Sequence, residues 1–306
     1  MINLLITIIG VLALICLWVL LYDSNRFVVA RYRMEDARIK KSCRFVVLAD
    51  LHNKQYGRNN ERLLAAIKEC KPDFILVAGD MLTAKPGKSP EAALHFLEAL
   101  AALYPVYYGN GNHEHRLKLY PSKYGDLGEQ YEKALRKMGI CLLVNEHVSL
   151  PEAGVVIYGS QIDKQYYKRF RVQKMEGDYL ESILGRIDRA GYNILIAHNP
   201  DYFPQYAEWG ADLVLSGHVH GGMVRIPFWG KGVVSPGIRL FPKYDGGLFR
   251  QGDSSMLLSR GLGMHTIPIR LFNPAEVLVV DLVPSGEKKT DAGRTDYGDT
   301  GKTGSV

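Results

Sequence analysis

Cysteine is scarce in this sequence and never occurs in closely spaced pairs. The four cysteines, Cys16, Cys43, Cys70 and Cys141, stand far apart, and there is no C-x-x-C motif. This spacing argues against a disulfide framework and against a cysteine-ligated zinc knot. We therefore expect four reduced cysteines that behave as small buried hydrophobic residues.

Charge is absent from the start of the chain. The twenty residues 2–21, "INLLITIIGVLALICLWVLL", contain no charged side chain. That length is enough for a helix to cross a bilayer core of about 30 Å. A cleaved signal peptide would have a basic segment before the apolar run and small residues after it, and neither is visible. We predict a retained membrane anchor over residues 1–22, with a buried core helix as the alternative.

Positive charge is concentrated just after this run. A basic juxtamembrane segment, residues 23–42, carries six cations: Arg26, Arg31, Arg33, Arg38, Lys40 and Lys41. Cations tend to stay on the cytoplasmic side of a membrane span, so we predict a single-pass protein whose main domain lies on the cytoplasmic face. The whole chain has a formal net charge of +6, but no nucleic-acid recognition motif accompanies it. We therefore expect no nucleic-acid partner.

The rest of the chain alternates between apolar runs and helical patterns. Strands are predicted at 26–35, 43–50, 73–80, 104–110, 141–145, 154–160, 193–198, 211–218, 254–260 and 275–283. Helices are predicted at 59–70, 89–103, 129–139, 178–191 and 203–210. This order indicates one α/β domain over residues 43–283. Residues 284–306 are nearly free of apolar side chains and are predicted to be a disordered tail.

Five of the predicted strands are followed directly by a carboxylate, an amide or an imidazole. These residues are Asp50 and His52, Asp80, Asn112 with His113 and Glu114, His198, and His218 with His220. One such residue is usually a helix cap or a solvated loop residue. Five at the edge where open α/β sheets bind their ligands favour a common site. Imidazole with carboxylate suits manganese, iron or zinc, and without cysteine ligands a closed structural zinc site is not favoured.

These residues also resemble, in type and order, the motif set of the calcineurin-like metallophosphoesterases. The resemblance covers residues 43–283, and "DLHN" with "GHVHGG" further resembles a membrane-associated bacterial branch of UDP-2,3-diacylglucosamine hydrolase-type enzymes. It implies a layered sandwich of two mixed β-sheets flanked by helices. It also implies two divalent metal ions, manganese first, with zinc, iron or magnesium as other candidates.

The same resemblance implies a role for each site residue. One metal would bind Asp50, His52 and His220, and the other Asn112, His198 and His218. Asp80 would bridge both, since two cations about 3.5–4 Å apart need a shared anion. His113 would act as the general acid toward the leaving oxygen.

One position departs from the family pattern. Many relatives carry a second Asp three residues after the bridging one, and it orients the general-acid His; here that position is Thr83. In purple acid phosphatases a tyrosine there ligates ferric iron, so that chemistry is not expected. Either Glu114 or the Thr83 hydroxyl could orient His113, and the sequence does not choose between them.

Three further features are weaker. The basic and aromatic run 163–174 could contact a nucleobase, a phosphate or anionic lipid, or be a solvated loop. The glycine-rich segment 226–249 could form a lid or a surface that contacts the acyl chain of a lipid substrate, or it could simply pack between strands. His265 lies in a loop that could border the site.

The sequence thus predicts a membrane-anchored phosphoesterase. Its substrate would be a phosphodiester or pyrophosphate in an amphipathic molecule, such as a UDP-linked or lipid-linked precursor. The alternatives are a broad nucleotide phosphodiesterase or phosphomonoesterase, and a non-catalytic membrane-tethered scaffold.

Overall fold

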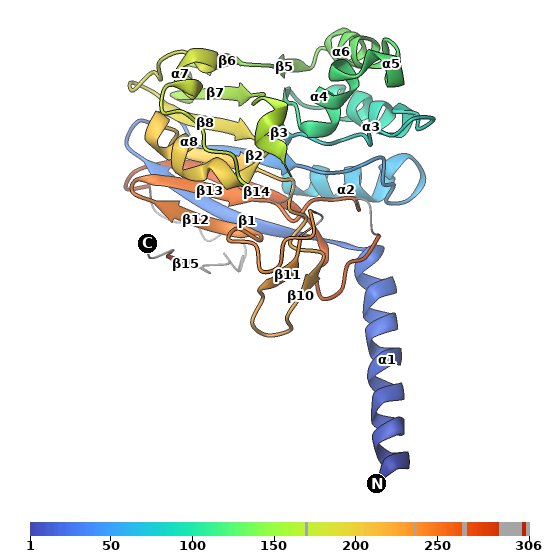
Figure 1. The fold of residues 1–306 in the computed structure, drawn as a ribbon. Helices are drawn as coiled ribbons and strands as arrows, with labels where there is room; N and C mark the ends of the chain where they lie inside the picture. Colours follow the sequence, from blue (N-terminus) through green and yellow to red (C-terminus); the bar gives the residue numbers. More distant parts are fainter. Residues whose placement is uncertain (169–170, 236, 265–267, 288–301, 304–306) are drawn as a thin grey trace.

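Two mixed β-sheets face each other in the computed structural model, which describes residues 1–168, 171–235, 237–264, 268–287 and 302–303 (Figure 1). The first sheet has the order β1 (Phe27–Asp36), β14 (Ala275–Pro284), β2 (Cys43–Leu48), β3 (Phe74–Ala78), β4 (Val106–Gly109) and β5 (Cys141–Leu143). The second has the order β15 (Lys302–Thr303), β12 (Gly247–Gln251), β13 (Ser254–Leu258), β9 (Leu213–Ser216), β8 (Tyr192–Ala197), β7 (Val155–Ser160) and β6 (Glu146–Leu150). The predicted fold class is confirmed.

The layers follow from the alternation of side chains along the strands. In β2, Phe45 and Val47 point into the core between the sheets, whereas Val46 and Leu48 point into an outer core. That outer core is covered by α2 (Glu61–Cys70), α3 (Glu91–Ala101), α4 (Asn112–Leu119) and α6 (Leu127–Lys137). The helices α7 (Tyr179–Leu184) and α8 (Phe203–Trp209) cover the outer face of the second sheet. The result is a helix–sheet–sheet–helix sandwich.

Two helices differ clearly from the sequence expectation: one is shorter than predicted and one was not predicted. The helix predicted over 178–191 ends at Leu184, because Gly185 adopts a φ of 75° and breaks the helical path. Helix α4 was not predicted, because the polar sequence "NHEHRLKL" shows little apolar periodicity. A one-turn helix, α5 (Pro121–Tyr124), and three short 3₁₀ turns, Arg58–Asn60, Lys164–Tyr167 and Pro200–Tyr202, complete the helical elements described.

The segment after the first helix belongs to the sandwich. Residues 27–36 form β1, which runs parallel to β14 from Phe27 opposite Ala275 to Asp36 opposite Pro284. Two of the cations counted as juxtamembrane charge are paired there, Arg33 with Glu35 and Arg38 with Asp36. The structure thus confirms the extended segment predicted over 26–35 and makes it an edge strand of the sandwich.

The first helix, α1 (Ile2–Ser24), projects away from the sandwich (Figure 1). Its 23 residues would extend about 35 Å, and only Asp23 is buried. Among the described residues, α1 is the one helix long and apolar enough to cross a membrane, and a signal sequence would have the same properties. All four cysteines are free, although only Cys70 is buried.

Candidate metal centre

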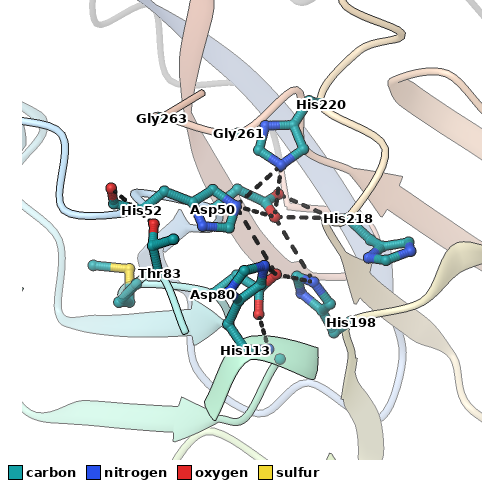
Figure 2. A network of polar contacts seen from close by, with 12 residues as sticks. Asp50, His52, Asp80, Thr83, His113, His198, His218, His220, Gly261 and Gly263 are labelled. Carbon is teal, nitrogen blue, oxygen red and sulfur yellow. Dashed lines mark hydrogen bonds and ion pairs between the residues drawn. The ribbon is translucent and has the colours of Figure 1, made fainter. Parts of the chain in front are cut away.

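The parallel strands β2, β3 and β4 of the first sheet, and β8 and β9 of the second, bring their carboxyl ends to one edge of the sandwich. Asp50 follows β2, Asp80 follows β3, and Asn112 and His113 open α4 just after β4. His198 follows β8, and His218 and His220 follow β9. The loops after these strands deliver all seven predicted metal ligands to that edge, and Figure 2 shows six of them.

Asp50, His52 and His220 form the first group. The Oδ1 atom of Asp50 lies 3.4 Å from Nε2 of His220 and 3.8 Å from Nε2 of His52. The two Nε2 atoms are 3.2 Å apart. The three ligand atoms therefore converge within 4.8 Å of one another, as expected for three residues that share one ion.

Asp80 belongs to two further groups of this kind. It converges with His198 and His218 on one side, and with His52 and His113 on the other. Its Oδ2 atom lies 3.1 Å from Nε2 of His198, 3.9 Å from Nε2 of His52 and 4.0 Å from Nε2 of His113. This shared position is what a bridging carboxylate requires.

Two details show that these side chains fit divalent cations. The Oδ1 atom of Asn112 is buried and accepts no hydrogen bond from the described residues. Because an unsatisfied buried acceptor is costly, this oxygen is suited to a cation. The Nδ1 atom of His198 lies 2.7 Å from the carbonyl oxygen of Ala78, to which it donates. That hydrogen bond directs Nε2 toward Asp80, the orientation typical of a metal-binding imidazole.

The backbone at the site is held in an uncommon conformation. Positive φ angles occur at five of the seven ligands: Asp50 (53°), His52 (49°), Asp80 (54°), His218 (72°) and His220 (53°). Non-glycine residues rarely adopt this region, and such strain concentrates at functional sites. Glycine makes the close approach possible at position 111, where an added Cβ would lie 2.2 Å from Oδ1 of Asp80.

Burial makes the two carboxylates and His198 depend strongly on one another. Burial, together with the charge of Asp80, raises the pKa of Asp50 to about 7, although His198 opposes the shift. Burial would lower the pKa of His198, but the Asp80 and Asp50 carboxylates outweigh it and raise that pKa to about 10. Burial likewise opposes the charge on Asp80, but His198 and His113 hold its pKa well below the usual range. Asp50 and Asp80 thus compete for positive charge, which two divalent cations would supply.

Neither residue considered for orienting His113 is its partner. Glu114 accepts hydrogen bonds from the backbone N–H groups of Asp80, Met81 and Gly111 and from the Tyr108 hydroxyl. Three of these hydrogen bonds thus come from the turn that carries Asp80 and from the start of α4, and the fourth comes from β4. The Thr83 hydroxyl donates to the carbonyl oxygen of His52 at 3.3 Å.

A backbone amide orients His113 instead. The N–H of Ala84 donates to Nδ1 of His113 at 2.8 Å. The sequence could not reveal this contact, because any residue at position 84 except proline would provide the same donor. Glu114 therefore positions the turn that carries Asp80, not the His113 ring that the sequence suggested it could orient.

Two buried side chains behind the site were missed by sequence reasoning. Arg270 donates hydrogen bonds to the backbone carbonyl groups of Arg260, Gly261 and Gly263. This loop packs against Asp50, and a Cβ on Gly261 would lie 2.8 Å from Cβ of Asp50. A lone arginine in a turn-rich segment carries no sequence signal for this role. His265 itself lies outside the described residues.

Asn273 is the second buried side chain behind the site that sequence reasoning missed. Its Nδ2 atom donates to the carbonyl oxygen of the predicted metal ligand His220 at 2.8 Å, and its backbone N–H donates to Oδ2 of Asp23 at 2.9 Å. Asp23 also pairs with Arg26. The last turn of α1 therefore reaches the metal centre through a single intervening residue.

A pocket opens beside the predicted metal ligands Asp80, Asn112, His218 and His220. Its wall combines cationic, aromatic and aliphatic side chains: Arg116, Lys168, Arg239, Tyr166, Tyr167 and Val172. The ring of Tyr167 lies 5.4 Å from that of His218, centroid to centroid. This wall includes part of the basic and aromatic run 163–174, of which residues 169–170 lie outside the described residues.

Solved structures with a similar arrangement include the NAD nucleotidase of Haemophilus influenzae, with a TM-score of 0.39 and 14% identity, and the sulfate thiohydrolase SoxB of Thermus thermophilus, with 0.44 and 12%. The match covers 73% and 78% of this chain but only 51% and 56% of those chains. The chain thus spans about half the length of these two proteins.

Relatives found by sequence share a higher identity with the chain. The metallophosphoesterase YkuE of Bacillus subtilis is 27% identical over 243 residues, 78% of each chain. The metallophosphoesterase Cj0846 of Campylobacter jejuni is 26% identical over 291 residues, 92% of this chain and 71% of the relative. The family model for calcineurin-like phosphoesterases matches residues 43–222, which contain every predicted metal ligand. The chain therefore belongs to the calcineurin-like phosphoesterase family and is a metal-dependent phosphoesterase.

Proposed function

We propose that this protein is a membrane-anchored dinuclear-metal phosphoesterase that hydrolyses a phosphodiester or pyrophosphate bond in an amphipathic substrate. The observation that carries the proposal is the convergence of two ligand groups on the shared carboxylate of Asp80. The metals would be held by Asp50, His52 and His220 and by Asn112, His198 and His218, with Asp80 between them. Manganese is our first choice, because imidazole and carboxylate ligands suit it.

Bound at these residues, two divalent cations would polarise the phosphoryl group and activate water for attack on phosphorus. The chain's own contribution to bond cleavage comes from His113. Because Nδ1 accepts the Ala84 N–H, the ring proton of neutral His113 lies on Nε2, on the Asp80 side. His113 would thus direct its Nε2–H at the leaving oxygen and stabilise the charge that develops there by hydrogen bonding.

The pocket beside the metals supports a substrate with both charged and apolar parts. Arg116 and Lys168 supply positive charge, and Tyr167 and Val172 supply apolar surface. Arg239 also faces the pocket but is paired with Asp201, which leaves less of its charge for the substrate. A UDP-linked or lipid-linked precursor, as in the UDP-2,3-diacylglucosamine hydrolase-type branch, would use both kinds of surface.

Anchoring by α1 is supported by its length and its exposed apolar surface. The cytoplasmic placement of the domain rests on the cations that follow α1. Because several of them form ion pairs within the sandwich, the charges available to set orientation are fewer than the sequence suggests.

The test is hydrolysis by the full chain in detergent micelles, stripped of metal and supplied in turn with manganese, zinc, iron or magnesium. The substrates are an activated monoester, an activated diester and a UDP-linked lipid precursor. We expect metal-restored turnover, fastest on the lipid precursor, and its loss in Asp80→Asn. The matched control is Asp253→Asn, the same change at an exposed residue of the β12–β13 turn.

The other possible results of this experiment would favour a different function or contradict the mechanism. Turnover on the activated diester or monoester alone would favour a broad nucleotide phosphodiesterase or phosphomonoesterase. A folded protein that binds two metals but cleaves none of the three substrates would favour a membrane-tethered scaffold. Equal rates for the parent and Asp80→Asn would contradict the assigned mechanism.

A further inference from the structure

Large apolar side chains are gathered on a small unit next to the metal centre. The β10–β11 unit, residues 224–235 and 237–242, contains β10 (Val224–Arg225) and β11 (Gly232–Val234). Its exposed apolar side chains are Phe228, Trp229, Ile238, Leu240 and Phe241, with exposed fractions between 56% and 110%. Apart from Met1, α1 and this unit, no large apolar side chain of the described residues is more than 46% exposed. An exposed group of this kind marks an interaction surface.

Backbone contacts hold the two halves of the unit together. Val234 forms a β-bridge with Leu240, and the N–H of Phe241 donates to the carbonyl oxygen of Val233 at 2.8 Å. The ammonium group of Lys231 donates to the carbonyl oxygen of Pro242 at 3.3 Å. The apolar side chains are thus carried by one hydrogen-bonded unit, and none of the five belongs to a hydrophobic core cluster.

The unit lies beside the end of α1 that is nearest the sandwich. Phe228 and Trp229 line a hollow together with Trp18, Val19 and Tyr22 of α1. Trp18 is six residues before the end of the helix, which corresponds to about 9 Å along its axis. Figure 1 shows β10 and β11 extending from the body on the side from which α1 projects. In a bilayer crossed by α1, this level is the interface, where tryptophan and tyrosine are enriched.

Positively charged side chains at the base of the β10–β11 unit are also consistent with a position at the membrane interface. Arg26 and Arg225 line the hollow, although Arg225 is paired with the buried Asp245, and Lys243 is exposed just after the unit. The acidic residues there are Asp23, which pairs with Arg26, and Glu276, which pairs with Arg260. Cations beneath exposed aromatic side chains are typical of segments that lie in a lipid interface.

We propose that the β10–β11 unit inserts Phe228 and Trp229 into the interfacial layer of the bilayer that α1 crosses. This inference rests on the proposed membrane anchoring. The unit begins four residues after His220, and its Ser235, Gly237 and Arg239 line the pocket beside the metals. Insertion would therefore open the pocket at the lipid surface, where the phosphate of an amphiphile reaches the metal centre while its acyl chains stay in the membrane.

The chain offers a direct test, because its three tryptophans report on three places: Trp18 in α1, Trp209 in α8 and Trp229 in the unit. Three variants of the full chain, each keeping one tryptophan and changing the others to phenylalanine, are reconstituted into phosphatidylcholine–phosphatidylglycerol vesicles. Fluorescence is measured with lipids brominated near the headgroup or deep in the acyl chain. Trp209 packs on Tyr158 in the outer layer of the second sheet and serves as the matched control.

We expect quenching of Trp229 mainly by the shallow bromine, quenching of Trp18, and none of Trp209. Quenched Trp18 with unquenched Trp229 would overturn the insertion and leave the anchor standing. Quenched Trp229 with unquenched Trp18 would support insertion of the unit and contradict the anchor. If neither is quenched, both proposals fail. Equal quenching of Trp209 and Trp229 would also overturn the insertion, because it would indicate non-specific contact with lipid.

Discussion

The metal-binding edge and the β10–β11 unit are neighbours with opposite construction. At the edge, Asp50, Asp80 and His198 are almost completely buried, and strained backbone and hydrogen bonds fix their positions. In the unit, Phe228 and Trp229 are exposed and contribute to no core cluster. The edge requires accurate placement of ligand atoms, whereas the unit requires contact area with an apolar environment.

This difference predicts two classes of variant. Changes at the edge should lower hydrolysis of every substrate, because they alter the site of bond cleavage. Changes in the unit should lower hydrolysis only when the substrate sits in a bilayer. The variants below test whether the two regions separate in this way, from the largest expected effect to the smallest.

Replacement of the shared carboxylate should have the largest effect. Asp80→Asn removes the anion that both ligand groups share. We expect activity on all substrates to fall by more than the roughly 100-fold that outer-shell changes cause. Metal analysis should also show loss of at least one bound ion. A variant that keeps both ions and the parent rate would contradict the role of Asp80.

Replacement of His113 should affect the chemical step alone. For His113→Gln we expect a loss of about 100-fold in kcat, the lower range for general acid–base catalysis, with both metals retained. The loss should be smaller for a substrate with a good leaving group, which needs little assistance at its oxygen. The matched control is His95→Gln on the exposed face of α3. Equal losses for good and poor leaving groups would argue against assistance by His113 at the leaving oxygen.

The support of His220 gives a smaller effect. Asn273→Ala removes the hydrogen bond to the His220 carbonyl, and we expect metal affinity to fall by about 10-fold. The control is Asn193→Ala, another buried asparagine whose amide donates to backbone carbonyl groups, but those of Asp188 and Gly191. Both variants should lose stability, but only the first should need more metal for half-maximal activity. Identical metal titrations would show that Asn273 supports the fold alone.

The mildest variants belong to the β10–β11 unit. For Phe228→Ser we expect an unchanged rate on a water-soluble diester. On a vesicle-embedded substrate we expect about a 10-fold loss, consistent with the roughly 1.5 kcal/mol gained by burying one large apolar side chain. Leu103→Ser, at an exposed apolar residue after α3, is the control and should change neither rate. Equal losses on both substrates would remove the distinction between the two regions.

The meeting of the candidate ligand side chains at one edge could be predicted from the sequence, because parallel strands bring their carboxyl ends together whatever the loops do. Asp50, Asp80 and His198 could be assigned to one site for that reason. The pairing of β1 with β14 was not predicted, because partners some 250 residues apart leave no local pattern. The partner of His113 was also missed, since a backbone donor has no side-chain signature. For the β10–β11 unit, the sequence showed apolar residues but not whether they were buried.

The hydrogen bond between Asp23 and Asn273 bears on the fate of the first helix during maturation. A peptidase cut between Asn25 and Phe27 would remove Asp23 and leave the buried N–H of Asn273 without its acceptor. The cost would be about 1–3 kcal/mol, placed next to the residue that supports His220. A chain shortened in this way would have a weakened metal centre even in water. Its lower activity would then reflect the altered loop rather than the missing lipid, so soluble forms for kinetic work should begin at or before residue 23.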